Sequence, residues 1–284
     1  MKRVLVTGGS GFIGRRLIEA LRRHAGAVLA PTRQEWDVAV DDEIPGFKVD
    51  HVFHLAGVSG VTASWDNPNR FHIVNTHGTA NVAEFCRRAE CSLSYVSGYC
   101  YGVPSRLPIS ETDAVRPNNP YAFSKFQAEE VCRFYHEYFG LAVTIIRPFN
   151  VYGAGQHESF VLTRIVRQAL DPGVNEIEVL DLLPRRDYVF VDDLVDALLR
   201  TADIGNCTVF NVGSGTSYSV EEAIQTVLAV SGVTKPYRSA GVRRRQEIPD
   251  VVADIASIET AVGWKPLVPF SEGVRRLVEA EVRR

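Results

Sequence analysis

The feature that most restricts the fold of this chain is a glycine-rich segment near its start, Gly8-Gly9-Ser10-Gly11-Phe12-Ile13-Gly14. It follows a short apolar run at residues 3–7, and the apolar side chains of residues 12–23 recur at helical spacing. A buried strand, a tight turn and a helix are therefore expected in that order. The helix N-terminus then offers free N–H groups to the phosphates of a dinucleotide. A P-loop is disfavoured, because no Gly-Lys-Ser/Thr follows.

Strand and helix patterns alternate along the first half of the chain. Apolar or β-branched runs predict further strands at residues 27–30, 36–38, 50–55, 92–97 and 141–146. Helical spacing predicts long helices at residues 71–88 and 120–139. This alternation is typical of an α/β fold with a Rossmann-type, doubly wound parallel sheet, which binds ligands at the carboxyl ends of its strands.

The alternation becomes less regular after residue 147. Short strands at 188–191 and 209–212 are expected among helices at 192–201, 220–231 and 271–282. We therefore expect a dinucleotide-binding domain at residues 1–150 and a smaller C-terminal α/β lobe for the substrate at residues 151–284, partly interwoven with the first.

Composition excludes several classes of protein. The net charge of -3 leaves no broad basic surface for nucleic acid. No apolar run approaches the ~20 residues that cross a bilayer, and the apolar run at residues 3–7 is too short for a signal peptide. The five cysteines include no CxxC pair, so free thiols, a cytoplasmic location and no metal site are expected.

Three side chains suggest chemistry beside the dinucleotide. Tyr121 and Lys125 are four residues apart at the start of a predicted helix and so share one face. A tyrosine pKa near ~10 is too high for a base at neutral pH, and a nearby lysine ammonium lowers it. Ser97, at the end of the strand predicted at 92–97, can hydrogen-bond the same substrate oxygen. Tyr-x-x-x-Lys alone arises by chance on surface helices, whereas the three residues behind a glycine turn predict an enzyme.

The end of the second predicted strand bears on the choice of cofactor. An acidic residue there would bind the ribose 2′-hydroxyl of NAD, but the chain has Ala30-Pro31-Thr32-Arg33. Thr32 and Arg33, with Arg15 as a further cation, favour the 2′-phosphate of NADP. NAD stays the alternative, because a solvated arginine is common.

Taken with further motifs, these residues resemble the extended short-chain dehydrogenase/reductases that act on nucleotide sugars, over nearly the whole chain. The matching motifs are Thr-Gly-Gly-Ser-Gly-Phe-Ile-Gly (7–14), His54-Leu55-Ala56-Gly57, Asn75 with Gly78-Thr79, Ser97 with Tyr101-Gly102, Tyr121 with Lys125, Arg147-Pro148-Phe149-Asn150-Val151-Tyr152-Gly153, and residues 186–193 from Arg186 to Asp193.

The resemblance implies roles for individual residues. Asp37 and Val38 would contact the adenine, Asn75 would lie near the cofactor, and Lys125 would hold the nicotinamide ribose. The other expected cofactor contacts are Gly8, Gly11, Phe12, Ile13, Gly14, Leu55, Ala56, Gly57, Tyr121 and Pro148. On the substrate side the resemblance implies contacts from Ser97, Tyr99, Asn150, Arg186 and Arg244. Of these, Asn150, Arg186 and Arg244 would bind the diphosphate, whose oxygens match the planar guanidinium groups of the two arginines.

Three reactions compete within this family resemblance. A 4,6-dehydratase carries Asp-Glu after the active-site Ser/Thr, whereas Gly98-Tyr99 follow Ser97 here, so dehydration is disfavoured. A 4-epimerase needs only the serine, tyrosine and lysine, but such enzymes usually carry an acidic residue after the second strand. We therefore favour a reductase that reduces the C4 keto group of a nucleotide-linked 4-keto-6-deoxyhexose, with the 4-epimerase next. Outside these three reactions, the chain could be a non-catalytic NADP-binding sensor, but its retention of Ser97, Tyr121 and Lys125 disfavours that class.

Two further expectations concern the substrate and the assembly. Some related reductases use an extra cysteine and histidine as substrate acid, but the equivalent positions here hold Tyr99, with Cys100 next to it, and Phe160. His157 could reach the substrate, although a loop histidine is more commonly just exposed. By resemblance, the predicted helices at 71–88 and 120–139 would pair two copies into a homodimer.

Overall fold

Six parallel strands form the larger sheet of the protein, in the order β2-β1-β3-β4-β5-β9. The structure is a computed structural model that describes residues 3–23, 26–40 and 46–283. The strands are β1 (Arg3–Thr7), β2 (Ala27–Leu29), β3 (His51–His54), β4 (Ser92–Val96), β5 (Val143–Pro148) and β9 (Thr208–Val212). The order reverses between β1 and β3, so a crevice at their carboxyl ends is the expected ligand position.

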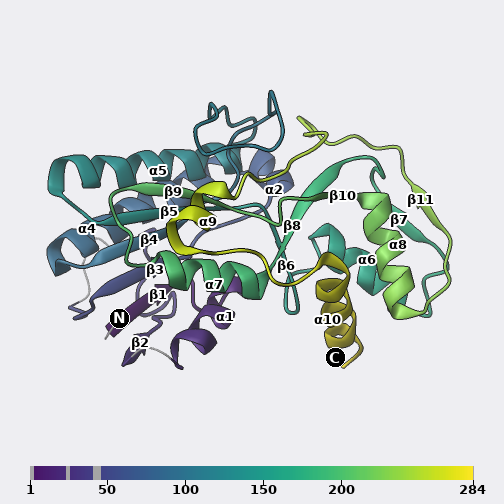
Figure 1. The fold of residues 1–284 in the computed structure, drawn as a ribbon, viewed down its shortest axis with the longest axis horizontal. Helices are drawn as coiled ribbons and strands as arrows, with labels where there is room; N and C mark the ends of the chain where they lie inside the picture. Colours follow the sequence, from purple (N-terminus) through teal and green to yellow (C-terminus); the bar gives the residue numbers. More distant parts are fainter. Residues whose placement is uncertain (1–2, 24–25, 41–45, 284) are drawn as a thin grey trace.

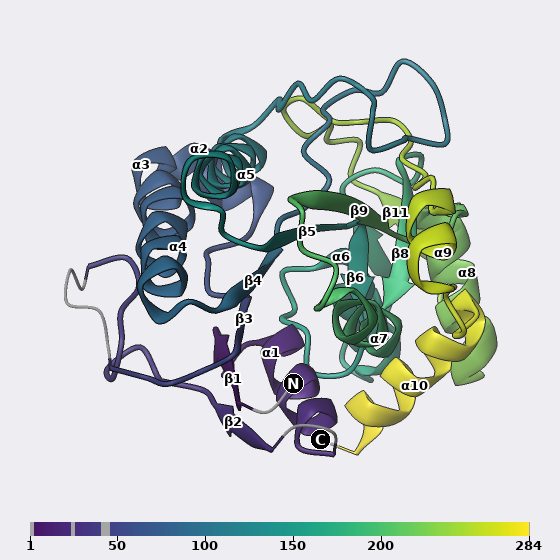
Figure 2. The same cartoon turned by 60° about the vertical axis from the view of Figure 1, so that its left-hand side comes forward.

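Successive side chains of the sheet alternate between two helical layers, as the period of a strand requires. Val4 and Val6 share a core with α1 (Phe12–Leu21) and α7 (Val191–Thr201), whereas Leu5 packs with α4 (Gly78–Ala89) and α5 (Pro120–Phe139). Figure 2 shows these two pairs of helices on opposite sides of the sheet. The predicted doubly wound parallel sheet is confirmed.

A second core lies beside the first and belongs to the smaller lobe on the right of Figure 1. Its strands form a three-stranded sheet, β10-β8-β6, and a two-stranded sheet, β11-β7. The elements are β6 (Asn150–Tyr152), α6 (Val161–Leu170), β7 (Ile177–Val179), β8 (Arg185–Phe190), β10 (Ser217–Ser219), α8 (Val220–Ser231), β11 (Tyr237–Ser239) and α10 (Phe270–Val282). Tyr152, Phe190 and Phe270 pack ring against ring at its centre. The remaining helix of this half, α9 (Ala256–Val262), lies next to β9.

The predicted strand at residues 36–38 is wrong. The chain turns after β2, where the N–H groups of Glu35 and Trp36 both donate to the carbonyl of Thr32. Trp36 and Val38 are apolar because they fill the core, Trp36 with its ring centroid 5.3 Å from that of Phe85. An apolar run this short does not distinguish a strand from a buried turn.

The helix predicted at residues 71–88 is continuous but changes pitch. It begins as α3 (Pro68–Phe71), widens into a π-helical turn, η1 (His72–His77), and continues as α4. A short helix, α2 (Val61–Asp66), precedes it. π-Helical turns commonly occur at functional sites, and Asn75 lies within this one.

Candidate active site

The turn between β1 and α1 is so tight that two of its glycines cannot carry a side chain. Gly8 has a φ of +71°, and a Cβ on it would lie 2.6 Å from the nitrogen of Ala56 and 2.7 Å from the carbonyl carbon of Leu55. A Cβ on Gly14 would lie 2.2 Å from the carbonyl oxygen of Gly8. The glycines therefore bring strand, turn and helix into direct contact, as the fingerprint requires.

The N-terminus of α1 is open to an anion. Its N-cap is Gly11, which has no side chain to accept from the N–H groups of the first turn, where Phe12 and Ile13 lie. That turn also contains no acidic residue. Unsatisfied N–H groups at the positive end of a helix dipole match the oxygens of a pyrophosphate, so this end of the site fits a dinucleotide.

The loop after β2 is more acidic than its first four residues suggest. The carboxylate of Glu35 accepts from the backbone N–H of Thr32 at 2.7 Å and from its hydroxyl at 2.9 Å. Arg33 is paired with Asp37, with 2.7 Å between Nε and Oδ2. Residues 30–33 hold no carboxylate, as noted in the sequence, but the turn returns Glu35 and Asp37 to Thr32 and Arg33.

Val38 and Arg15, two other residues expected near the adenosine end of the cofactor, lie in different parts of the structure. Val38 is buried, and one of its methyl carbons would lie 3.2 Å from a Cβ on Gly78 at the start of α4. Arg15 lies beside Gly155 in the loop after β6, with Nη2 3.8 Å from the point a Cβ would occupy there. Pro148 ends β5 and pairs with Val212 of β9.

The loop after β3 is tied to the π-helical turn. The Asn75 side chain accepts from the N–H of Val58 at 2.8 Å and donates to its carbonyl at 3.0 Å. A Cβ on Gly57 would lie 2.8 Å from Oδ1 of Asn75 and 4.0 Å from Nζ of Lys125. The structure thus brings together Gly57, Asn75 and Lys125, three residues predicted to lie around the cofactor.

Tyr121 and Lys125 lie on the first turns of α5, which begins with Pro120 and is capped by Asn119. The Asn119 side chain accepts from the N–H of Ala122 at 2.9 Å, which fixes the start of the helix. The Tyr121 hydroxyl would lie 3.4 Å from a Cβ on Gly98, directly after Ser97. Tyr121 and the end of β4 therefore face the same space.

Burial controls the pKa values of both groups. It lowers the pKa of Lys125 to about 8, which the negative charge of Glu129 partly opposes. It also raises the pKa of Tyr121 to about 12, with smaller contributions from Tyr99 and Cys100. The expected lowering of the tyrosine pKa by Lys125 is therefore wrong for this state of the protein, because desolvation of the phenolate dominates.

Ser97 is held by a buried ion pair that was not predicted from the sequence. Its hydroxyl donates to Oε1 of Glu129 at 2.6 Å. Arg147 donates to both oxygens of the same carboxylate, from Nε at 2.9 Å and from Nη2 at 2.6 Å. Glu129 lies eight residues after Tyr121 on α5, a helical spacing that places both on one face and was the available clue.

On the substrate side, the two predicted arginines, Arg186 and Arg244, both lie beside the carboxylate of Glu247. Arg186 at the start of β8 pairs with Oε1 of Glu247 and donates to the carbonyl of Ile248 at 2.8 Å. Arg244 has its Nε 3.8 Å from the other oxygen of Glu247. Glu247 was not predicted from the sequence, although it lies only three residues after Arg244.

Two polar atoms nearby are buried among the described residues without a hydrogen-bond partner, Nδ2 of Asn150 and the hydroxyl of Tyr188. They come from paired positions of neighbouring strands, since Asn150 of β6 is in register with Tyr188 of β8. Tyr99 is half-buried and stacks on Phe149 with ring centroids 5.4 Å apart. Buried, unsatisfied polar groups are rare, so this region is suited to a polar ligand.

Comparison with known proteins agrees with this geometry. The sequence model of the NAD dependent epimerase/dehydratase family matches residues 4–213. The chain belongs to this family. The family resemblance seen in the sequence is thereby confirmed.

Individual members of the family are similar over the whole chain. GDP-6-deoxy-D-mannose reductase of Pseudomonas aeruginosa is 32% identical, over 99% of this chain and 99% of that protein. The solved structure of RMD from Pseudomonas aeruginosa with NADPH is 32% identical, covers 100% of both chains and gives a TM-score of 0.90. The Thermus thermophilus UDP-glucose 4-epimerase complex with NAD is 30% identical over 98% of both chains, with a TM-score of 0.83.

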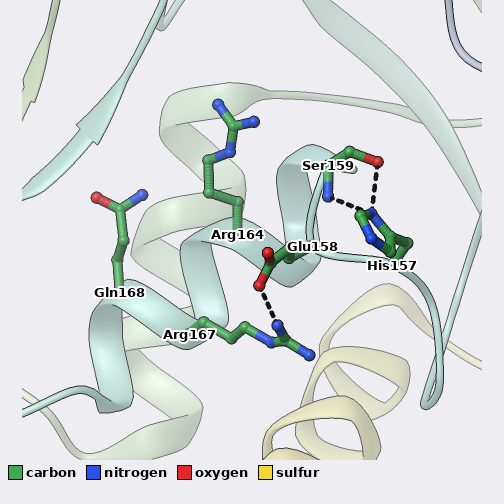
Figure 3. Close-up of a pocket in the computed structure, with 6 residues that line it drawn as sticks. All are labelled: His157, Glu158, Ser159, Arg164, Arg167 and Gln168. Atoms are coloured by element: carbon green, nitrogen blue, oxygen red, sulfur yellow. Dashed lines mark hydrogen bonds and ion pairs between the residues drawn. The ribbon is translucent and has the colours of Figure 1, made fainter.

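His157 makes its hydrogen bonds within its own loop. It contacts Ser159 at 3.0 Å and lines a shallow hollow of about 370 Å³ on α6, with Glu158, Arg164, Arg167 and Gln168 around it. Figure 3 shows Arg167 turned towards Glu158 and Arg164 pointing away from both. Among the described residues, His157 has no hydrogen bond to Ser97, Tyr121 or Lys125.

Neither a metal cluster nor a membrane-spanning helix occurs in the described residues. In 3–23, 26–40 and 46–283, no group of three or more His, Cys, Asp or Glu side chains is arranged to hold a metal ion. No helix in the same ranges has the length and apolar character needed to cross a membrane.

Proposed function

We propose that this protein is an NADPH-dependent reductase that converts the C4 keto group of a nucleotide-linked 4-keto-6-deoxyhexose to an alcohol. The observation that carries the proposal is the full-length similarity to GDP-6-deoxy-D-mannose reductase, together with the fold shared with an NADPH complex. NADP in preference to NAD is part of the proposal.

The chain's own residues would act as follows. Tyr121 would give its proton to the sugar O4, and Ser97 would accept a hydrogen bond from the hydroxyl formed there. Lys125 would supply positive charge beside both and hold the nicotinamide ribose. The bound nicotinamide supplies the hydride that forms the new C–H bond at C4. Since burial raises the pKa of Tyr121 to about 12, the phenol is protonated at neutral pH, which is the form a reduction consumes.

The end of β4 supports reduction over dehydration. A Cβ at position 98 would lie 3.4 Å from the Tyr121 hydroxyl, so a carboxylate there would meet the reacting oxygen. Glycine at this position leaves that space without an acid or base for eliminating water.

Arg186, Arg244 and Asn150 would bind the diphosphate of the sugar nucleotide. The two arginines already meet on one carboxylate, Glu247, which shows that both guanidinium groups can reach a single anion. Planar guanidinium groups match phosphate oxygens well.

A 4-epimerase is the second candidate, and a specific observation favours it. Glu35 and Asp37 place carboxylates at the loop after β2, where an acidic residue binds the ribose of NAD. The similarity to the Thermus thermophilus UDP-glucose 4-epimerase complex with NAD points the same way.

One experiment separates the two candidates. The purified protein is first examined for bound nicotinamide, and then given NADPH or NADH with GDP-, dTDP- and UDP-linked 4-keto-6-deoxyhexoses. The reductase consumes NADPH with one of these sugars. If the protein instead holds NAD tightly and interconverts UDP-glucose and UDP-galactose without added cofactor, the reductase is overturned and the epimerase takes its place. Cofactor binding without either reaction would favour the non-catalytic sensor.

We also propose a homodimer paired through α4 and α5. Support comes from α5, where Phe123, Phe134, Tyr138 and Phe139 are exposed, since exposed apolar clusters mark interaction surfaces. All five cysteines are free, as expected in a reducing compartment. A cytoplasmic location stays a prediction.

A further inference from the structure

Glu129 is a fully buried carboxylate in contact with a proposed catalytic residue. It is 0% exposed, and five groups contact its two oxygens. Ser97 and Nε of Arg147 donate to Oε1, where the Cys100 thiol is also close at 3.6 Å. Nη2 of Arg147 and Nη2 of Arg133 approach Oε2, at 2.6 and 3.4 Å.

The helix excludes direct action of Glu129 on the sugar. Glu129 lies eight residues after Tyr121 on α5, which is a rise of roughly 12 Å along the helix axis. Ser97, at the end of β4, bridges this distance because its hydroxyl reaches Glu129 while Gly98 next to it approaches the Tyr121 hydroxyl. The direct contact between Glu129 and the site is therefore the Ser97 hydroxyl, while the charge of Glu129 also acts on Lys125 by raising its pKa.

Stability alone does not explain this ion pair. A buried ion pair generally stabilises a fold no better than apolar side chains of the same volume, because both charges lose their hydration. Here Nη1 of Arg147 is buried without a hydrogen-bond partner among the described residues, and the guanidinium lies over the ring of Tyr101, 4.8 Å from its centroid. Arg147 nevertheless binds both oxygens of Glu129 and so fixes the carboxylate that accepts the hydrogen bond of Ser97.

We propose that Glu129, anchored by Arg147, is a positioning residue for Ser97. A hydroxyl has one proton and two lone pairs. Because the Ser97 O–H donates its hydrogen bond to Glu129, the Ser97 oxygen is held at the end of β4 with its lone pairs turned towards the site. In that state it accepts a hydrogen bond from the Tyr121 phenol before the sugar binds, and from the hydroxyl formed at the sugar C4 once the phenol has given up its proton. This inference rests on the proposed function, because it concerns the same reaction.

The test is a double-mutant cycle between Ser97 and the ion pair. Since Glu129→Gln alone would strand the Arg147 guanidinium, the ion pair is neutralised as Glu129→Gln with Arg147→Met. The kcat and KM for the nucleotide sugar are measured in the wild type, Ser97→Ala, the neutralised pair, and the neutralised pair with Ser97→Ala. Urea unfolding of all four proteins reports stability separately.

We expect the neutralised pair to lower kcat about tenfold with KM changed less than about twofold, and to lower it no further when Ser97 is already alanine. A general structural role would lower kcat by the same factor in both backgrounds, and that result would overturn the inference. So would wild-type kcat in the neutralised pair. Glu281→Gln is the control for loss of a buried glutamate's ion pair, because Glu281 pairs with Arg167 in the other lobe and should leave kcat unchanged.

The failure of the proposed function looks different. A wild-type protein that converts no nucleotide sugar would overturn both the proposed function and the role of Glu129. An active wild type with equal effects of the neutralised pair in both backgrounds would overturn only the role of Glu129.

Discussion

The ammonium group of Lys125 lies over the ring of Tyr95, 4.4 Å from its centroid. Burial lowers the pKa of this lysine to about 8, so the charge that the reaction is proposed to use depends on interactions that favour the protonated form. The electron-rich face of the Tyr95 ring is one of them.

This contact predicts a pH dependence. The ammonium is present below its pKa and lost above it, so kcat should fall as the pH rises through about 8. Tyr95→Leu removes the ring and lowers the lysine pKa further, which should move the alkaline limb of the pH–kcat profile about one unit to lower pH. Tyr95→Phe keeps the ring and should leave the limb in place. An unmoved limb in Tyr95→Leu would show that Lys125 does not determine it.

Tyr121→Phe removes only a hydroxyl. If this group donates the proton, kcat should fall by about 10²- to 10⁴-fold. NADPH binding, followed by the fluorescence of the reduced cofactor, should not change. Tyr138→Phe is the matched control, because Tyr138 lies on the same helix with 64% of its surface exposed. Unchanged turnover in Tyr121→Phe would remove the catalytic assignment.

Gly14→Ala tests the contact between α1 and the glycine turn. Alanine favours a helix by about 1 kcal/mol over glycine, so helix propensity alone predicts greater stability. The new Cβ would, however, meet the carbonyl oxygen of Gly8 at 2.2 Å. We expect the contact to dominate, with a loss of about 1–3 kcal/mol in the free energy of unfolding in urea. Gly46→Ala, with nothing within 4 Å of the added Cβ, should be close to neutral, and a stabilised Gly14→Ala would contradict the described turn.

Arg33→Ala tests the cofactor preference. If Arg33 leaves Asp37 to bind the 2′-phosphate, its removal should raise KM for NADPH about tenfold and leave KM for NADH unchanged. Arg23→Ala is the control, since that arginine lies beyond the opposite end of α1 and is 70% exposed. Equal changes for both cofactors would mean that Arg33 does not contact the phosphate.

Much of the fold was predictable because glycines, proline and strand periodicity act locally. The turn at residues 8–14 and the start of α5 at Pro120 depend on a few neighbouring residues, and both lie where the sequence indicates. Trp36 was misassigned because an aromatic residue suits a strand and a buried turn equally well.

The site was less predictable where it depends on distant contacts. Glu129 and Glu247 have no role in the sequence prediction, and the packing of α5 beside the end of β4, and of Glu247 against Arg186 of β8, brings them to Ser97 and Arg186. The sequence also predicts the wrong direction for the shift of the Tyr121 pKa. Burial, which raises this pKa, depends on the whole fold, whereas the effect of Lys125 is inferred from spacing alone.

The position of β9 has a consequence for how the protein is made. This strand pairs with β5 from Thr144 to Pro148, yet the chain builds β6, α6, β7, β8 and α7 before it reaches β9. Chains are synthesised from the N-terminus, so a nascent chain that ends near residue 150 presents the fully buried strand β5 as an unpaired edge. Such edges pair readily with other chains. The ribosome must therefore deliver most of the smaller lobe before the larger sheet can close, and a gene cut between the two lobes would encode an aggregation-prone fragment.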